Sequence, residues 1–181
     1  MAIILNALAK PGAVKILEAA RGEVETLTPL KINCGKLCGG ACCEPDETGE
    51  NGMLLFPFEE AFYKEPIEGF PFHLAEDDTL FKGGKRFVCE GKCKREHRPL
   101  ACRIFPLRIR VEEKDGETVA KAEIDPRAWC VCPILEKGGM RAMSQEFIAA
   151  VERAGNHLTK NVYMLEALLN EQRMIDEMRT L

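Results

Sequence analysis

The first hydrophobic pattern along the chain has the spacing of a helix. Apolar side chains recur between positions 14 and 20, and this pattern predicts a helix over residues 9–20. Pro11 is compatible with the first turn of such a helix, where its missing N–H breaks no hydrogen bond. Gly22 is expected to end the helix. The apolar positions are Val14, Ile16, Leu17 and Ala20.

From Ser144 onward, the hydrophobic positions again follow a helical period. Gly155 and Asn156 lie within this stretch, where they either kink one long helix or separate two. The apolar face favours packing of the helix on its own domain, and the alternative is a homodimer formed through the C-terminal helix. The apolar positions are Phe147, Val151, Ala154, Leu158, Val162, Leu165, Leu168, Ile175 and Met178.

Between the helical regions, the pattern changes to short apolar runs. Residues 53–58 predict a buried strand that ends near Pro57. A helical turn over 59–64 follows, and then an irregular stretch rich in proline. Glu59 and Glu60 are adjacent, so they cannot face each other as a catalytic acid/base pair. They are interpreted as charges in the first turn of a helix.

Two β-hairpins are predicted in the middle of the chain. The first joins residues 79–82 to 85–89 through a pair of glycines, a connection typical of tight hairpins, and would deliver Cys89 at its end. The second joins 104–112 to 117–124 around a Lys-Asp-Gly turn. Its first arm alternates Leu107, Ile109 and Val111 with Arg108 and Arg110.

These elements predict an α+β fold in one domain that spans residues 1–181, a length that allows an ordinary apolar core. Residues 1–33 are expected to form an N-terminal helical segment, and 141–181 a mainly helical C-terminal region. Between them, residues 34–133 are expected to form a small, irregular, cysteine-rich metal core with short β-hairpins. No linker or internal repeat indicates a second domain.

Nine cysteines occur in three groups in the middle of the chain. The sequence shows no secretory leader and no run of about 20 apolar residues that could span a bilayer. We therefore expect a cytoplasmic protein without membrane association, in which thiols stay reduced and clustered cysteines indicate metal. The cysteines are Cys34, Cys38, Cys42, Cys43, Cys89, Cys93, Cys102, Cys130 and Cys132.

The densest group lies in residues 34–43, with the spacing Cys-x3-Cys-x3-Cys-Cys and three glycines. Thiolates are soft ligands suited to zinc and to iron–sulfur clusters. The glycines let the backbone approach a centre and adopt positive φ. Adjacent Cys42 and Cys43 diverge from one backbone, so they either serve different centres or leave one thiol beside a centre. Two four-coordinate sites would leave one of the nine cysteines unused.

The cysteine motifs resemble those of a known family. The group at 34–43, the pair Cys89 and Cys93, and the run Arg-Pro-Leu-Ala-Cys-Arg-Ile-Phe-Pro at 98–106 resemble the YkgJ-type CxxCxxCC cysteine-cluster family, described as zinc- or iron-chelating. The first two spacings are x3, whereas the family's name implies x2. The resemblance implies binding of a metal or cluster rather than a particular reaction. A related cysteine cluster occurs in flagellin lysine methylases, which are similar only in this region.

Other interpretations of the cysteines are weaker. Structural disulfides fit a reducing compartment poorly, and nine free thiols would be reactive. Cys34, Cys38 and Cys42 suggest a radical-SAM triad, but the second gap is one residue too long. Zinc tolerates these ligands, yet the chain has no Cys-x2-Cys knuckle and has more cysteines than one structural zinc site needs. We therefore favour an iron–sulfur cluster over zinc.

Residues 85–110 carry nine basic and two acidic side chains, a formal charge of +7 in a chain of net −4. We interpret this charge as compensation for thiolates, because four thiolates on one divalent ion leave two surplus negative charges. The alternative is an anion or nucleic-acid binder that uses this segment, but no aromatic interleaving or nucleic-acid motif supports it.

Several non-cysteine side chains are candidates for a role beside the centre. Arg98 and Arg103 flank Cys102, where their guanidinium groups could neutralise the charge of a cluster. His97 is expected to face solvent, and Trp129 to shield the site or fill the core. No catalytic residue is assigned.

The sequence thus predicts a metal- or iron–sulfur-cluster-binding protein, with a metal ion or cluster and a protein as its expected partners. Whether it is an enzyme stays open at this point. A closed shell of four cysteines would indicate a structural or carrier role, and an open coordination position would indicate a redox or protein-modifying enzyme.

Overall fold

The structure is a computed structural model that describes residues 9–32, 35–43, 52–89 and 93–179. The predictions that concern Cys34 lie outside these ranges. Helices combine with two small antiparallel sheets, so the predicted α+β class is confirmed. No helix in the described ranges has the length and apolar character needed to cross a membrane.

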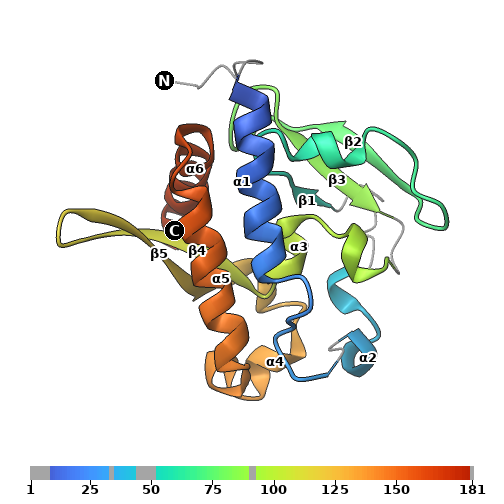
Figure 1. The fold of residues 1–181 in the computed structure, drawn as a ribbon. Coiled ribbons are helices and arrows are strands. Elements are labelled where there is room, and N and C mark those ends of the chain that lie inside the picture. The colour runs from blue at the N-terminus through green and yellow to red at the C-terminus, as the bar shows by residue number, and fades with distance from the viewer. Residues whose placement is uncertain (1–8, 33–34, 44–51, 90–92, 180–181) are drawn as a thin grey trace.

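We call one half of the fold the helical body. It comprises the helices α1 (Lys10–Glu23), α5 (Gln145–Leu158) and α6 (Val162–Met178), and the hairpin of β4 (Leu107–Lys114) and β5 (Glu117–Ile124). The helix α1 runs beside α5, which packs on the hairpin (Figure 1). Both predicted helical regions are therefore confirmed.

Local chemistry explains where these helices begin and end. Pro11 occupies the first turn of α1, as predicted, but Gly22 lies inside the helix, which continues to Glu23. The Ser144 hydroxyl accepts the N–H of Phe147 at 3.4 Å and caps α5. The Ser144 cap satisfies an N–H group that has no partner within the helix.

The C-terminal region forms two helices, but the break follows Leu158 rather than Gly155 and Asn156. The side chain of Asn161 accepts the first N–H groups of α6 and so begins a new helix. Gly155 lies inside α5, where a Cβ atom would come within 2.5 Å of the Cβ of Ala120 on β5. The glycine therefore serves the close approach of helix and hairpin, and does not produce a kink.

The second predicted hairpin is confirmed, with one boundary corrected. Asp115 and Gly116 connect the strands with φ values of 54° and 80°, the positive values that a tight hairpin connection requires. The first arm begins at Leu107, because Ile104 belongs to the short helix α3 (Leu100–Ile104).

The first predicted hairpin is wrong in its first arm. The partner of β3 (Lys85–Cys89) is β2 (Phe72–Glu76), in the stretch predicted to be irregular, and residues 79–82 are not a strand. The sheet has the order β1-β3-β2, in which β1 covers only Met53–Leu54. Stacking of Phe72 on Phe87 across the sheet, with ring centroids 5.0 Å apart, stabilises this pairing.

The remaining elements are short helical turns between these helices and strands. They are α2 (Gly35–Cys38), α3 (Leu100–Ile104), α4 (Pro133–Glu136) and the 3₁₀ turns η2 (Ala41–Cys43), η3 (Glu59–Tyr63), η4 (Arg95–His97), η5 (Pro126–Ala128) and η6 (Gly139–Ala142). The turn η3 confirms the predicted helical turn after the first strand.

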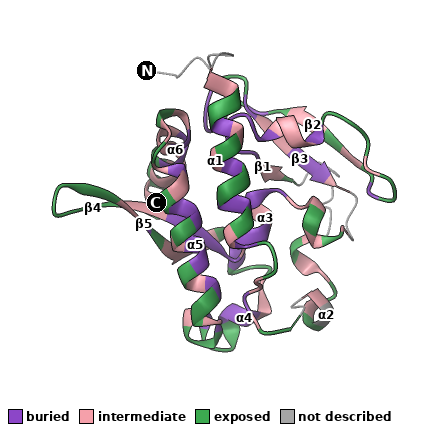
Figure 2. Cartoon of the chain, viewed as in Figure 1, coloured by how far each residue is buried: buried purple, intermediate pink, exposed green. Residues whose placement is uncertain are grey.

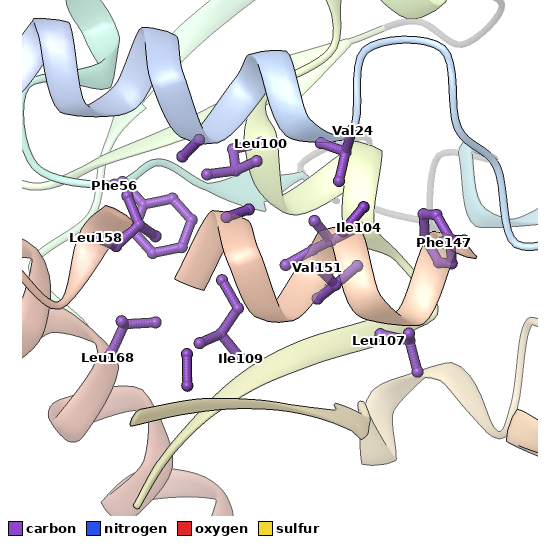
Figure 3. Packing of buried hydrophobic residues seen from close by; sticks show 14 of the residues in the cluster. Val24, Phe56, Leu100, Ile104, Leu107, Ile109, Phe147, Val151, Leu158 and Leu168 are labelled. Carbon is purple, nitrogen blue, oxygen red and sulfur yellow. The ribbon is translucent and has the colours of Figure 1, made fainter. Parts of the chain in front are cut away.

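The larger hydrophobic core lies inside the helical body. Phe147 and Val151 of α5 and Leu17 of α1 are fully buried, at 0% exposure. Figure 3 shows α5 between α1 on one side and the β4–β5 hairpin on the other, with apolar side chains filling both interfaces. Figure 2 shows buried residues along the facing sides of α1 and α5 and exposed residues on their outer sides.

Arg108 departs from the predicted alternation, because it is only 2% exposed. Its guanidinium lies 2.6 Å from the Glu123 carboxylate and 3.9 Å from that of Asp176 on α6. The helix α6 thus covers the polar side of β4. Packing of α6 on its own domain matches the favoured interpretation of the C-terminal pattern, and the homodimer stays a prediction.

Candidate thiol site

The described cysteines come from four separate segments. Cys38 ends α2, and Cys42 and Cys43 lie in η2. Cys89 ends β3, and Cys93 follows shortly after it. The rest are Cys102 in α3, and Cys130 and Cys132 in the loop before α4. Of these segments, α3 contributes Leu100 and Ile104 to the hydrophobic core of the helical body, and Cys132 packs against that core.

Two glycines shape the first of these segments. Gly39 and Gly40 join α2 to η2 with φ values of 67° and 84°, as the sequence predicted for glycines in this loop. The N–H of Cys43 donates to the carbonyl of Gly40 at 2.7 Å and closes the turn. The turn brings Cys38 and Cys42 to the same cavity.

Two cavities lie among the cysteines. The first has a volume of about 310 Å³, and the second about 170 Å³. The thiol-bearing residues that line the first are Cys42, Cys43, Cys89, Cys93 and Cys102. Those that line the second are Cys38, Cys42, Cys43, Cys102 and Cys132. The structure therefore brings together seven of the nine predicted ligands at two adjoining cavities.

Cys130 stands apart from this group. It is exposed and lines neither cavity. Its neighbour Trp129 is also exposed, at 54%, so the prediction that Trp129 shields the site or fills the core is wrong. The loop around Val131 turns these two side chains outward, while Val131 and Cys132 face the second cavity.

Cys42 and Cys43 form a polar pair, with their Sγ atoms 3.8 Å apart in a hydrogen bond. This hydrogen bond, together with the positive charge of Arg98, lowers the pKa of Cys43 to about 6, although burial acts in the opposite direction. The same hydrogen bond, burial and the nearby thiols of Cys38 and Cys102 raise the pKa of Cys42.

Cys102 occupies the wall between the cavities, on the short helix α3. Burial raises the pKa of its thiol well above the ordinary value, and the nearby Cys43, Cys89 and Cys93 act in the same direction. These three cysteines line the first cavity together with Cys102. A cation in this cavity would favour the thiolate forms that burial now disfavours.

The guanidinium of Arg98 is in direct contact with this thiol group. Its Nε donates to the Sγ of Cys93 at 3.3 Å, and an Nη donates to the Cys93 carbonyl at 3.4 Å. Burial lowers the pKa of Arg98, but this hydrogen bond and the charges of Cys93, Cys43 and Cys102 outweigh it and raise the pKa. The guanidinium is thus placed to offset thiolate charge.

Arg103 has a different environment from Arg98. It is 2% exposed, its Nη1 lies 3.0 Å from the Glu25 carboxylate, and its Nε and Nη2 donate to the carbonyls of Arg98 and Glu96. These interactions hold the loop that carries Arg98. Arg95 acts similarly by donating to carbonyls that include that of Val24 at the end of α1.

The remaining basic side chains of 85–110 that the structure describes each lie within ion-pair distance of a carboxylate. The ion pairs are Lys85 with Glu76, Arg86 with Asp77, Lys94 with Glu96, Arg108 with Glu123, and Arg110 with Asp176. This pairing gives little support to an anion or nucleic-acid surface, because the charges are balanced locally.

Sequence reasoning missed a buried polar network behind Cys102. Glu59 is 0% exposed, and its carboxylate accepts the N–H of Leu100 at 2.7 Å and that of Phe56 at 3.1 Å. Arg21 of α1 pairs with it at 3.1 Å. Leu100 begins α3, so Glu59 fixes the start of the helix that carries Cys102. The sequence carried no signal for this role, because Glu59 has the same residue type as its partly exposed neighbour Glu60.

A test of fit separates the candidate metals. Four Zn–S bonds of about 2.3 Å in a tetrahedron hold the sulfur atoms about 3.8 Å apart. Cys42 and Cys43 have this separation. However, in the described residues no three His, Cys, Asp or Glu side chains are grouped closely enough to hold one metal ion. Cysteine thiolates are suitable ligands for a thiophilic metal. However, the described thiols line cavities without gathering at one point, so their arrangement does not match a single enclosed zinc ion.

Comparison with protein-family models, curated proteins and solved structures finds no match to this chain.

Proposed function

We propose that this protein binds a metal centre through clustered cysteines, as its resemblance to the YkgJ-type family implies. One observation carries the proposal: thiols from η2, β3, the loop after it and α3 face one cavity of about 310 Å³. The guanidinium of Arg98 lies against the same cavity and contacts Cys93. Thiolates gathered beside a cation are the environment that an anionic thiolate centre needs.

Within this proposal, an iron–sulfur cluster is favoured over zinc. A cluster holds its thiolates farther apart than a single ion does, because iron atoms and bridging sulfides lie between them. This preference is consistent with two observations: five cysteines line the first cavity, and no three His, Cys, Asp or Glu side chains of the described residues are grouped closely enough for a single ion. The residues that would hold the centre are Cys43, Cys89, Cys93 and Cys102, with Arg98 donating to sulfur.

Anaerobic purification with elemental analysis and an absorption spectrum tests the proposal. We expect iron and acid-labile sulfide, with a broad visible absorption that is lost on oxidation. Cys102→Ser should reduce the metal content most, because Cys102 lies on the wall between both cavities. Cys130→Ser is the matched control, since Cys130 lines neither. A colourless protein with zinc and no iron would overturn the preference for a cluster, and a metal-free protein would overturn the proposal.

A second candidate function is a metal- or cluster-dependent enzyme. The first cavity favours it, because its wall includes Met53, Phe87 and Phe105 as well as the thiols, and its volume of about 310 Å³ exceeds the space that a metal ion needs. Small-molecule sites are typically apolar hollows of at least about 300 Å³ with few polar groups. The test is to add small thiols, carboxylates or redox partners to the metal-loaded protein and record its absorption spectrum. If none of them changed the spectrum, the enzyme hypothesis would be rejected and the metal-binding role would remain.

A further inference from the structure

The second cavity reaches the surface among exposed apolar side chains. Three segments contribute to its wall, namely the loop after α1, the helix α2 and the loop before α4. Each of them presents a large apolar side chain to solvent, in Ile32, Leu37 and Val131 respectively. Trp129, in the same loop as Val131, is also exposed. We call these four residues the apolar rim, and two of them, Leu37 and Val131, also line the cavity itself.

Apolar exposure is concentrated at the rim and on one helix. The other large apolar side chains that are exposed in the described part of the chain are Val162, Leu169 and Met178, all on α6. The helix α6 lies well away from α2 and α4 (Figure 1). Single exposed apolar residues are ordinary on protein surfaces, whereas a group of them around a cavity indicates a binding surface.

The size of the second cavity fits one bulky apolar side chain. Its volume is about 170 Å³, and its wall includes Leu30, Phe105 and Ile134. An apolar cavity of about 150 Å³ in another protein holds one benzene molecule, whereas sites that enclose a whole drug-sized ligand have about 300–1,000 Å³. One anchoring side chain in a pocket, surrounded by contacts that exclude water, is the usual arrangement at the centre of a protein–protein interface.

The charges beside the cavity select an acidic partner. Arg95, Arg98 and Lys137 line it, and no Asp or Glu of the described residues does. Arg98 donates to the thiol and the carbonyl of Cys93, and neither Arg98 nor Lys137 pairs with a carboxylate in the described part of the chain. Complementary charge across an interface speeds association and suppresses binding of wrong partners, so carboxylates are the expected neighbours of these cations.

We infer that the second cavity and the apolar rim are a docking site for an acidic segment of a partner protein. The segment inserts one bulky apolar side chain into the cavity and places carboxylates beside Arg98 and Lys137. A segment seated there covers Cys38 and Cys132, which line only this cavity. The inference does not depend on the proposed metal binding, because the surface consists of side chains that the metal-free chain already has.

Binding of short synthetic peptides to the wild-type chain tests this inference. The probes are blocked five-residue peptides with a central phenylalanine, leucine or methionine and two glutamates on each side. Trp129 is the single tryptophan of the chain, and its emission should shift to shorter wavelength as a peptide covers the rim. Matched peptides with a central alanine, or with glutamine in place of glutamate, should bind about tenfold more weakly. If no glutamate peptide bound better than its matched peptides, the inference would be wrong.

Variants at exposed positions locate the peptide without disturbing the core. Leu37→Ser should weaken binding of the glutamate peptides about tenfold, and Lys137→Gln about threefold, because they remove an apolar contact and an exposed charge respectively. Leu169→Ser and Lys160→Gln change exposed residues of the same types outside the cavity and should leave the affinity unchanged. Equal losses in Leu37→Ser and Leu169→Ser would contradict the docking site.

Two further measurements distinguish other occupants of the same surface. If phenylacetate bound as tightly as the phenylalanine peptide, the cavity would be a site for a small carboxylate. If the wild-type chain sedimented as a dimer that Leu37→Ser dissociated and Leu169→Ser did not, the occupant would be a second copy of the chain. Either result would rule out a partner segment, whereas weaker binding of phenylacetate and a chain without such a dimer would support it.

Discussion

The helical body and the thiol region, which we define as residues 35–43, 89, 93–102 and 128–133, are built on different principles. In the body, long helices and a regular hairpin bury apolar side chains such as Phe147 completely. In the thiol region, short turns surround two cavities, and most of the described thiols are partly exposed. Burial of apolar surface therefore stabilises the body directly, at about 25 cal/mol per Å². The thiol region has less such burial, and we expect its order to depend on anchors and on bound metal.

The two regions share part of the apolar core, through Leu100 and Ala128, and are also joined by buried polar anchors. Glu59 connects Arg21 of α1 to the start of α3, and Arg95 and Arg103 bind backbone carbonyls between α1 and α3. Such groups are costly to bury without partners, so each must stay paired for the junction to hold. The following predictions test whether the regions respond separately.

Glu59→Ala should have the largest effect, because it disturbs both regions. Removal of the carboxylate leaves Arg21 without its partner and the N–H groups of Leu100 and Phe56 without an acceptor. Loss of one member of a buried ion pair costs about 3–5 kcal/mol. We expect a loss of that size in the free energy of unfolding, measured by urea titration at pH 7, together with reduced metal content.

Glu60→Ala is the matched control for this change. Glu60 pairs with Lys10 at 2.9 Å on the surface, where an ion pair contributes about 0–1 kcal/mol. Equal destabilisation by the two variants would show that Glu59 is not the anchor between the regions.

Gly155→Ala should have a smaller effect, confined to the helical body. The added methyl group would lie 2.5 Å from the Cβ of Ala120 and 2.8 Å from Cγ2 of Ile109. Overpacking costs about 1–3 kcal/mol, which is partly offset by the better helix propensity of alanine, by about 1 kcal/mol. We expect a lower midpoint of urea unfolding with unchanged metal content per folded chain.

Gly22→Ala in α1 is the control for this substitution, because no atom lies within 4 Å of its added Cβ. It should leave stability unchanged or slightly raised. If Gly155→Ala lowered metal content while Gly22→Ala did not, the separation of the body from the thiol region would be disproved.

The elements of the helical body were easier to predict from the sequence than the arrangement of the thiol region. Helices and the second hairpin were predictable because an apolar face or an Asp-Gly turn specifies them locally. The strand β2 was missed because its pairing depends on aromatic contacts with Phe87 and Tyr63, which are distant in sequence. The burial of Arg108 depends on α6, which follows more than 50 residues later.

For the thiol region, the sequence identified the candidate ligands but not their arrangement. Spacing alone could not show that Cys42 and Cys43 line both cavities, nor that Cys130 is exposed while Cys132 lines a cavity. Those features depend on how η2, α3 and the loop before α4 meet in space. Glu59 and its partly exposed neighbour Glu60 illustrate the same limit, because only the tertiary fold distinguishes a buried anchor from a charge with access to solvent.

The last prediction concerns thiol reactivity in the metal-free chain, where Cys43 and Cys102 of the thiol region should differ. We expect it to involve the smallest change in stability. The pKa of Cys43 is lowered to about 6 by the hydrogen bond from Cys42 and by Arg98, while burial raises that of Cys102. At pH 7 a thiol with a pKa near 6 is about 90% thiolate, the form that reacts with iodoacetamide. We therefore expect Cys43 to be alkylated rapidly at pH 7 and Cys102 slowly.

The dependence on pH gives the sign of this effect. A lowered pKa means that the Cys43 thiolate is present above about pH 6 and is lost as pH falls through that value. The rate of Cys43 alkylation, followed by mass spectrometry, should rise between pH 5 and 9 with a midpoint near 6. Arg98→Gln should move the midpoint upward, because it removes a positive charge near the thiolate. If Arg98→Gln left the midpoint unchanged, this guanidinium would not act on the thiols. Its proposed role as the charge-compensating group beside the metal centre would then be disproved.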